Sequence, residues 1–305
     1  MDVATPHNAA PLADANAGSL SGDIAPAREH IVKHRAAEAE PAPTLQMMGA
    51  PIGMVTELEA VDLIIGAALE NRGHWTITAN LDHVRRYNRE EVARAVIDEA
   101  DLVVADGMPL VWASRLAGEP LPERVAGSSM VWPICEMASL TRRTIFLLGG
   151  DPGVASQAAS IFCERYPDLR IAGTACPEMG FMDDPAALER LRWDLIAAAP
   201  SIVFVALGFP KQDLLIRHLR ADLPETVFIG VGISLSYVTG DVNRAPAWIC
   251  NLGLEWAYRL SQEPTRLARR YLVDGMPFAL RLLFSAARHR CARAGLGTAN
   301  GWGRG

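Results

Sequence analysis

The chain has 305 residues, half of them hydrophobic, with a formal net charge of −6 and an isoelectric point near 5.7. A chain of this length can bury one large core, or one core with a smaller appendage. Its acidic balance argues against a general nucleic-acid binder, which normally carries a basic excess. Five scattered cysteines without a CxxC pair indicate reduced, buried thiols and a cytosolic location.

Residues 1–45 are rich in Ala, Pro, Asp and Glu and show no apolar periodicity, so we expect a disordered N-terminal extension. The first residues lack the basic and apolar regions of a signal peptide. No apolar run reaches the roughly 20 residues that a membrane-spanning helix needs. Order is expected from about residue 46. A helix should follow soon after, with Thr56 as its N-cap and Glu59 completing a capping box.

Between residues 46 and 240, apolar β-branched runs alternate with helical patterns. Near-continuous apolar strands separated by helices predict a doubly wound, mainly parallel, Rossmann-like sheet that is covered on both faces. Ligands of such sheets bind at the carboxyl ends of the strands, so the residues that follow each run are the candidates for a site. The predicted strands lie at 75–80, 101–107, 144–150, 169–175, 201–208 and 226–232.

From residue 241 to 293 the alternation gives way to a helical, Arg-rich appendage, followed by a flexible tail over 294–305. We expect Pro264 and Pro277 to divide the appendage into short helices. Its last helical pattern mixes apolar and basic residues, which is typical of a helix lying on anionic lipid; core packing or a dimer interface is the alternative. The apolar residues are Phe278, Leu282, Leu283 and Phe284, and the basic ones are Arg281, Arg288 and Arg290.

Polar residues end the first two predicted strands. Thr78 and Asn80 can hydrogen-bond sugar or phosphate, although Asn80 can equally cap the next helix. Asp106 is placed where a partly buried carboxylate can act as a base with a raised pKa; an N-cap or turn aspartate before Gly107 is the alternative. Arg124 lies in a polar loop that suits an anion, or it forms a surface salt bridge.

Two further turns suit phosphate. Gly149 and Gly150 let the backbone approach a ligand just before a helix N-terminus, although their spacing matches neither the dinucleotide fingerprint nor the P-loop. Lys211 and Gln212 occupy the turn after the strand at 201–208. Several such turns beside Asp106 favour a phosphate-bearing substrate. The sequence has no DxD or HExxH motif, so we expect no metal and no cofactor, and protein cations would stabilise a leaving diphosphate.

The candidate residues above lie within a series of motifs that follow one another along the chain. The longer motifs are "PERVAGS", "GFPKQD", "GDVNRAPAW", "LGLEWAYRL" and "EPTRLARRYL". With them, the chain from about Met48 to Leu283 resembles the WecG/TagA/CpsF glycosyltransferases, known as family 26. The resemblance implies an inverting, metal-independent enzyme of exopolysaccharide or cell-surface polysaccharide synthesis. Such an enzyme moves a hexose, of the glucose or N-acetylmannosamine type, from a UDP-sugar to a polyprenyl-diphosphate-linked sugar.

The resemblance also implies roles for residues. Asp106 is expected to be the catalytic base, and Thr78, Asn80, Arg124 and Gln212 are expected to line the active site. Arg259, Arg266 and Arg269 of the appendage are expected to close over the pocket and face the donor diphosphate. The sequence departs from the family pattern at Asp213, where Glu is usual. It departs again at 235–237, where a more aromatic and acidic run is usual, and this leaves the donor sugar open.

The expected partners are therefore the UDP-sugar, the lipid-linked acceptor and the inner face of the cytoplasmic membrane, with no nucleic acid; homo-oligomerisation is left open. Two other functions use a similar architecture. An NAD-dependent oxidoreductase should carry GxGxxG after the first strand and an acidic residue about 20 positions later, and the sequence has neither. A non-catalytic nucleotide-sugar or lipid-binding protein would have similar pockets without turnover.

Overall fold

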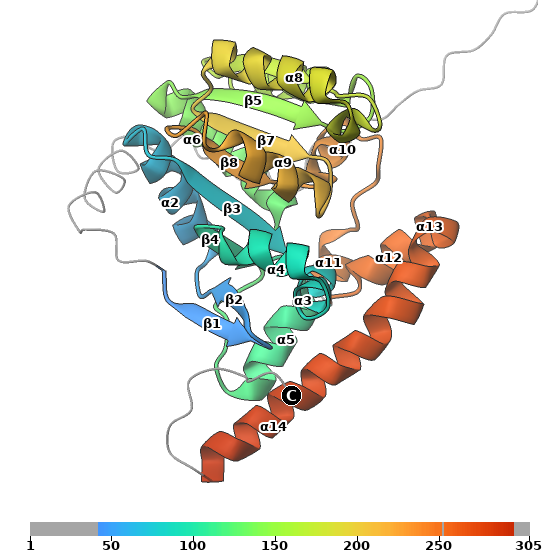
Figure 1. Ribbon diagram of the computed structural model, residues 1–305. Coiled ribbons are helices and arrows are strands. Elements are labelled where there is room, and N and C mark those ends of the chain that lie inside the picture. The colour runs from blue at the N-terminus through green and yellow to red at the C-terminus, as the bar shows by residue number, and fades with distance from the viewer. Residues whose placement is uncertain (1–41, 252, 296–305) are drawn as a thin grey trace, which may run out of the picture. The chain divides into compact units, whose positions relative to one another are not determined.

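The computed structural model describes residues 42–295, apart from residue 252 (Figure 1). The expected N-terminal extension up to residue 41 and the tail from 296 lie outside the described residues. The first element is an antiparallel hairpin of β1 (Thr44–Met47) and β2 (Ala50–Gly53). Regular structure therefore begins two residues before the expected boundary at 46, with a hairpin that the sequence pattern did not indicate.

A six-stranded sheet forms the centre of the described chain, with strand order β4-β3-β8-β7-β5-β6 and every neighbouring pair parallel. Each strand corresponds to one of the six predicted runs, so the prediction of a doubly wound, Rossmann-like sheet is confirmed. The strands are β3 (His74–Ala79), β4 (Leu102–Ala105), β5 (Thr144–Gly149), β6 (Arg170–Ala175), β7 (Ile202–Ala206) and β8 (Val227–Gly230).

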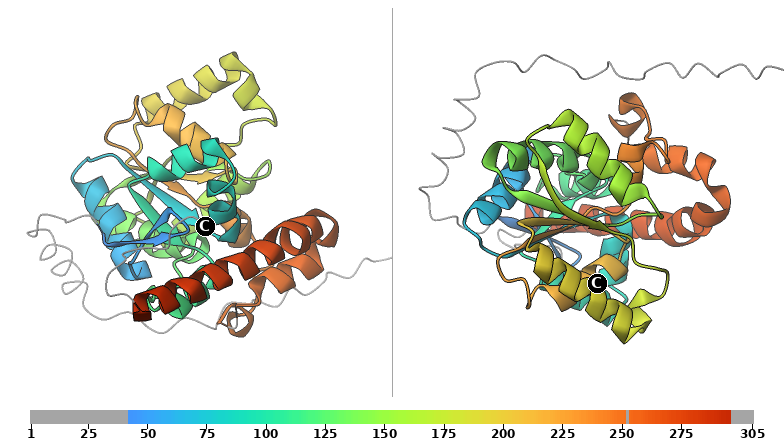
Figure 2. Two further views of the ribbon diagram at one scale, coloured as in Figure 1. Left: turned by 60° about the horizontal axis from the view of Figure 1, so that its bottom comes forward. Right: turned by 90° about the horizontal axis from the view of Figure 1, so that it is seen from above.

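Helices cover both faces of this sheet (Figure 1 and Figure 2). Side chains alternate along each strand: Val103 and Ala105 of β4 belong to one hydrophobic cluster, whereas Leu102 and Val104 belong to the other. The first cluster packs α3 (Leu81–Tyr87), α4 (Glu91–Asp98), α5 (Met108–Ala117), α8 (Pro185–Ala198) and α9 (Lys211–Leu219). The second packs α2 (Glu57–Leu69), α6 (Gly127–Thr141), α7 (Val154–Arg165) and α10 (Ser234–Thr239). A short 3-10 turn, η1 (Phe181–Asp183), precedes α8.

The start of α2 is set by local sequence. Thr56 accepts a hydrogen bond from the backbone N–H of Glu59 at 3.2 Å, and the Glu59 carboxylate accepts one from the backbone N–H of Thr56 at 2.8 Å. This is the predicted capping box, in which two helix-terminal donors are satisfied reciprocally. The prediction is confirmed because the motif depends only on residues within one helical turn.

The C-terminal segment, residues 247–295, is helical. Its elements are α11 (Ala247–Asn251), α12 (Glu255–Gln262), α13 (Pro264–Ala268), the π-helix η2 (Arg269–Gly275) and α14 (Met276–Gly295). Pro264 opens α13, where its missing N–H costs nothing. The expectation that Pro277 separates two helices is wrong. The N–H of Met276 bonds the carbonyl of Tyr271, and this π-type pairing carries the chain past the proline into α14.

One face of α14 packs against α5, and the opposite face is exposed (Figure 1). Phe278 and Leu282 are buried in the first hydrophobic cluster, and Leu283 is partly buried against it. Only Phe284 of the four predicted lipid-facing residues is exposed. The alternative of core packing is therefore correct for Phe278 and Leu282. None of the described helices is both long and apolar enough to cross a bilayer.

The packing of α14 yields a matched pair of substitutions. Leu282 is 0% exposed and Leu280 is 63% exposed, two residues away on the same helix. We predict that Leu282→Ala lowers the free energy of unfolding by about 2–4 kcal/mol, because it leaves a cavity in the core. Leu280→Ala should change it by no more than about 0.5 kcal/mol. Urea titrations of both variants measure this, and equal effects would show that α14 does not dock through Leu282.

Candidate active site

The predicted site residues gather at one edge of the sheet, because the carboxyl ends of parallel strands meet there. They do not all lie together. Asp106 follows the outer strand β4, whereas the Gly149–Gly150 turn follows β5, with β3, β8 and β7 between them. Adjacent strands are about 4.8 Å apart, so the two positions are separated by roughly 20 Å along the edge. A ligand that contacts both must be extended.

Asp106 is held just beyond β4 by its backbone. Its N–H donates to the carbonyl of Ala79 at 2.7 Å, and its carboxylate accepts a hydrogen bond from the N–H of Gly127 at the start of α6. The residue remains partly exposed, and Gly107 rather than Asp106 is the N-cap of α5. The residue thus lies partly exposed at the edge of the sheet, with its carboxylate largely removed from water.

The electrostatic surroundings of Asp106 suit a base. Burial raises its pKa from 3.8 to about 6, the neighbouring Arg124 guanidinium acts against this rise, and the Glu255 carboxylate adds to it. Arg244 also lowers the pKa. A carboxylate with a pKa of this size is ionised at neutral pH, yet basic enough to accept a proton in a transition state.

Arg124 forms an ion pair with Glu255 of α12 at 2.7 Å, and the two side chains are only 18% and 21% exposed. The salt bridge that the sequence left as an alternative for Arg124 is therefore present, in a half-buried position beside Asp106. It fastens the C-terminal segment to the end of β4. Arg124 remains charged beside Asp106, as a residue that binds an anion must be.

A chain of contacts runs from Asp106 along the strand ends. Gly127, which donates to Asp106, packs so closely on β3 that a Cβ there would lie 3.4 Å from Thr78 Oγ1. The Thr78 hydroxyl donates to the carbonyl of Gly230 at 2.8 Å. A Cβ at Gly230 would in turn collide with the side-chain amide of Gln212. Thr78 thus holds the end of β8, and its expected contact with a ligand stays a prediction.

Gln212 is 2% exposed, and its carbonyl accepts hydrogen bonds from the N–H groups of Gly208 at 3.1 Å and Gly232 at 3.3 Å. It therefore joins the turns that follow β7 and β8. Lys211, the first residue of α9, is exposed at the same edge. The expected binding of substrate by these two residues stays a prediction, and the structure adds a positioning role for Gln212.

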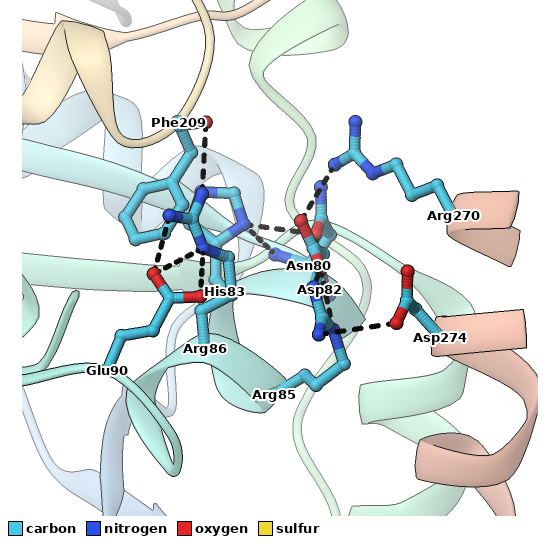
Figure 3. A network of polar contacts seen from close by, with 9 residues as sticks. All are labelled: Asn80, Asp82, His83, Arg85, Arg86, Glu90, Phe209, Arg270 and Asp274. Atoms are coloured by element: carbon cyan, nitrogen blue, oxygen red, sulfur yellow. Dashed lines mark hydrogen bonds and ion pairs between the residues drawn. The ribbon is translucent and has the colours of Figure 1, made fainter. Parts of the chain in front are cut away.

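Asn80 caps α3, which is the alternative that the sequence left open. Its Oδ1 accepts from the backbone N–H of Asp82 at 3.0 Å, and its own N–H donates to Nδ1 of His83 at 3.2 Å. Figure 3 shows that this cap belongs to a larger polar network. Two ion pairs in it join α3 to η2: Arg270 with Asp82 at 3.4 Å and Arg85 with Asp274 at 3.8 Å. The C-terminal segment is thus also held to the end of β3.

The Gly149–Gly150 turn requires glycine. Both residues have positive φ, and a Cβ at Gly149 would lie 2.6 Å from the carbonyl oxygen of Ala206. The N–H of Gly150 donates to the same oxygen at 2.9 Å. The connections that follow β5 and β7 leave in opposite directions, toward β6 and β8 respectively. Open α/β sheets bind ligands at such a switch point.

The three predicted arginines of the C-terminal segment have different surroundings. Arg259 of α12 lies beside Tyr237 of α10, whose pKa it lowers. Arg266 donates to Glu263 at 2.8 Å, and the carboxylate of Asp151 in the glycine turn also raises its pKa. Arg269 is exposed at the start of η2. Arg259 and Arg266 thus bring positive charge to the strand ends, and their contact with a diphosphate stays a prediction.

Sequence reasoning missed three residues beside Asp106: Arg244, Glu255 and Tyr237. Arg244 and Glu255 belong to the motifs "GDVNRAPAW" and "LGLEWAYRL", and Tyr237 belongs to the stretch that departs from the family pattern. Charged residues within motifs beyond the last strand were the available signal. Within the described ranges, no three side chains of His, Cys, Asp or Glu come together as a metal site.

Known proteins resemble the chain over most of its described length. Residues 45–292 match the profile of the Glycosyl transferase WecG/TagA/CpsF family. An N-acetylglucosaminyldiphosphoundecaprenol N-acetyl-beta-D-mannosaminyltransferase of Bacillus spizizenii is 32% identical over 66% of the chain and 76% of its own length. An enzyme of the same name from Bacillus subtilis is 34% identical over 57% of the chain and 66% of its own length. Another from Staphylococcus aureus is 28% identical over 74% of the chain and 87% of its own length.

The raised pKa of Asp106 has a consequence for stability. Because its pKa is about 6 in the folded chain and 3.8 unfolded, the folded state binds the proton more tightly, and stability falls as the pH rises through that interval. An asparagine side chain at this position would resemble the protonated acid. We predict that Asp106→Asn is more stable than the natural chain at pH 8, by about 1–3 kcal/mol, with a gap that closes near pH 4.

Urea titrations between pH 4 and pH 8 measure this difference, and the same substitution at exposed Asp168 serves as a control. An Asp106→Asn curve that runs parallel to that of the natural chain at every pH would show that the folded and unfolded pKa values are equal.

Proposed function

Because the chain belongs to the WecG/TagA/CpsF family of glycosyl transferases, we propose that it moves N-acetylmannosamine from a UDP-sugar to a polyprenyl-diphosphate-linked N-acetylglucosamine. The activities by which the relatives are named support this sugar and this acceptor over a glucose transfer. The observation that carries the proposal is the position of Asp106. Its carboxylate belongs to a partly exposed residue at the ligand-binding edge, has a pKa of about 6, and lies within electrostatic reach of Arg124 and Arg244. The product would enter a cell-surface polymer.

The proposed reaction is a single displacement. Asp106 accepts the proton of an acceptor hydroxyl while the hydroxyl oxygen attacks C1 of the donor sugar. The bond between C1 and the diphosphate oxygen breaks, UDP leaves with both electrons, and the configuration at C1 inverts. Arg259 and Arg266 stabilise the negative charge that develops on the diphosphate, a task that many transferases give to a metal ion.

The remaining residues would hold the donor across the strand ends. Thr78 and Asn80 are next to Asp106 in the sheet order, so we assign them to the sugars. The Gly149–Gly150 turn, Lys211 and Gln212 lie around the switch point, so we assign them to the nucleotide. An extended UDP-sugar is the kind of ligand that can span the roughly 14 Å between the ends of β3 and β5. Arg269 would add charge above the diphosphate.

The test is a panel of UDP-sugars, including UDP-glucose, assayed for UDP release with lipid-diphosphate N-acetylglucosamine, with and without EDTA. UDP-N-acetylmannosamine should be the best donor, release should require the acceptor, and EDTA should have no effect. Release from no donor would overturn the proposed transfer. Loss of activity in EDTA would overturn only the metal-free mechanism.

Asp106→Asn is the matched variant for this assay. It should bind UDP as the natural chain does, but its transfer rate should fall by about 10²–10⁴-fold, because removal of a general base costs that much. In the natural chain, kcat/KM should rise with pH through about 6, as the Asp106 carboxylate becomes ionised. Turnover of Asp106→Asn at the natural rate would exclude Asp106 as the base.

We further propose that the exposed side of η2 and α14 rests on the inner face of the cytoplasmic membrane, where a polyprenyl-linked acceptor is embedded. The exposed apolar residues of this membrane face repeat at helical spacing, and arginines flank them. Apolar and basic residues on one helix suit an anionic lipid surface. The apolar residues are Leu272, Val273, Met276, Leu280 and Phe284, and the basic ones are Arg281, Arg288 and Arg290.

Liposome flotation can test this membrane face. The natural chain should float with vesicles that contain anionic lipid, and the double variant Leu280→Glu/Phe284→Glu should remain in the lower fraction. Trp193→Glu on α8, which also replaces an exposed apolar side chain, should float normally. Equal flotation of the double variant and the natural chain would rule out docking through this face.

A further inference from the structure

Two buried polar atoms near the candidate active site have no hydrogen-bond partner among the described residues: the hydroxyl of Tyr237 and Nε of Arg259. They come from different parts of the chain, α10 and α12, and they lie within electrostatic reach of each other. A buried polar group without a partner costs about 1–3 kcal/mol. Two such atoms within electrostatic reach of each other therefore need a physical explanation.

Both atoms are hydrogen-bond donors. A guanidinium nitrogen has no acceptor capacity. Burial raises the pKa of Tyr237 to about 12 in spite of the nearby Arg259, and the carboxylates of Glu255 and Asp106 act in the same direction as burial. The phenol therefore keeps its proton at neutral pH. The missing partner must be an acceptor, and a phosphate offers several acceptor oxygens with the charge that Arg259 requires.

The position of Tyr237 selects one part of the donor. Tyr237 is close enough to Asp106 for this carboxylate to raise its pKa, and close enough to Arg259 for this cation to lower it. In a displacement that inverts C1, the leaving oxygen lies on the far side of C1 from the base. A residue within electrostatic reach of both the base and a cation can therefore contact the group that leaves. Glu255 does not fill this role, because the Tyr237 hydroxyl has no hydrogen-bond partner among the described residues.

We propose that Tyr237 is a further substrate-binding residue, whose hydroxyl donates a hydrogen bond to the leaving diphosphate that Arg259 also binds. This assignment rests on the proposed function and deepens it. Tyr237 belongs to the run at 235–237 in which this sequence departs from the family pattern. The hydroxyl would strengthen its bond as charge develops on the leaving oxygen, so it would contribute to the rate as well as to affinity.

Tyr237→Phe tests the assignment, because it removes the hydroxyl and keeps the ring. Without ligand, its melting temperature should equal or slightly exceed that of the natural chain, since the hydroxyl bonds no described residue. The Kd for UDP should rise by about 10-fold to 100-fold, which is the value of a hydrogen bond to a charged group. The kcat of transfer should fall by a similar factor.

Tyr166→Phe is the matched control, because Tyr166 ends α7 and its surroundings are Glu136, Arg165 and Cys135. This variant should keep the natural Kd and kcat.

Each other outcome has a separate meaning. If the natural chain binds UDP and Tyr237→Phe binds it equally with equal kcat, a water molecule or packing accounts for the unpaired hydroxyl, and the assignment is overturned while the proposed function stands. If Tyr237→Phe melts lower and keeps its affinity for UDP, the role of Tyr237 is structural. If the natural chain neither binds UDP nor uses any UDP-sugar, the proposed function and this assignment fail together.

Discussion

The half-buried ion pair between Arg124 and Glu255 is the contact on which the site depends. It joins α12 to the loop beside β4, and both of its charges act on Asp106. Loss of either partner would leave the other charge poorly solvated and change the field at the carboxylate. Because Glu255 and Arg259 lie one helical turn apart on α12, the same contact also sets where the arginine meets Tyr237.

Around this pair, the site has two sides with different tasks. The strand ends supply a carboxylate whose pKa is raised by burial, together with a glycine turn at the switch point of the sheet. The C-terminal segment supplies the cations, and it is tied down a second time through the Arg270–Asp82 and Arg85–Asp274 pairs. Asp106 keeps a raised pKa although Arg124 and Arg244 act against the rise, because burial outweighs both cations.

Several residues that were expected to touch a ligand are seen holding the backbone of the site. Asn80 caps α3, Thr78 bonds the end of β8, and Gln212 joins two turns. Such contacts fix the strand ends in place before any ligand arrives, which lowers the cost of organising the site on binding. A positioning role and a binding role are compatible for Thr78 and Asn80, which lie near Asp106 in the sheet order.

The sequence by itself determined the six strands, their alternation with helices, and the capping box at Thr56, because these follow from backbone periodicity and from contacts within one turn. It also placed Asp106, the glycine turn, Lys211 and Gln212 at one edge. Only the tertiary structure decided which face of α14 is buried and that Pro277 does not end a helix. It also decided that Arg124 pairs with a residue 131 positions away. Finally, it showed that the Tyr237 hydroxyl is buried without a partner among the described residues. These outcomes depend on which surfaces pack together in the folded chain. A local sequence pattern does not predict a contact between segments that are far apart along the chain.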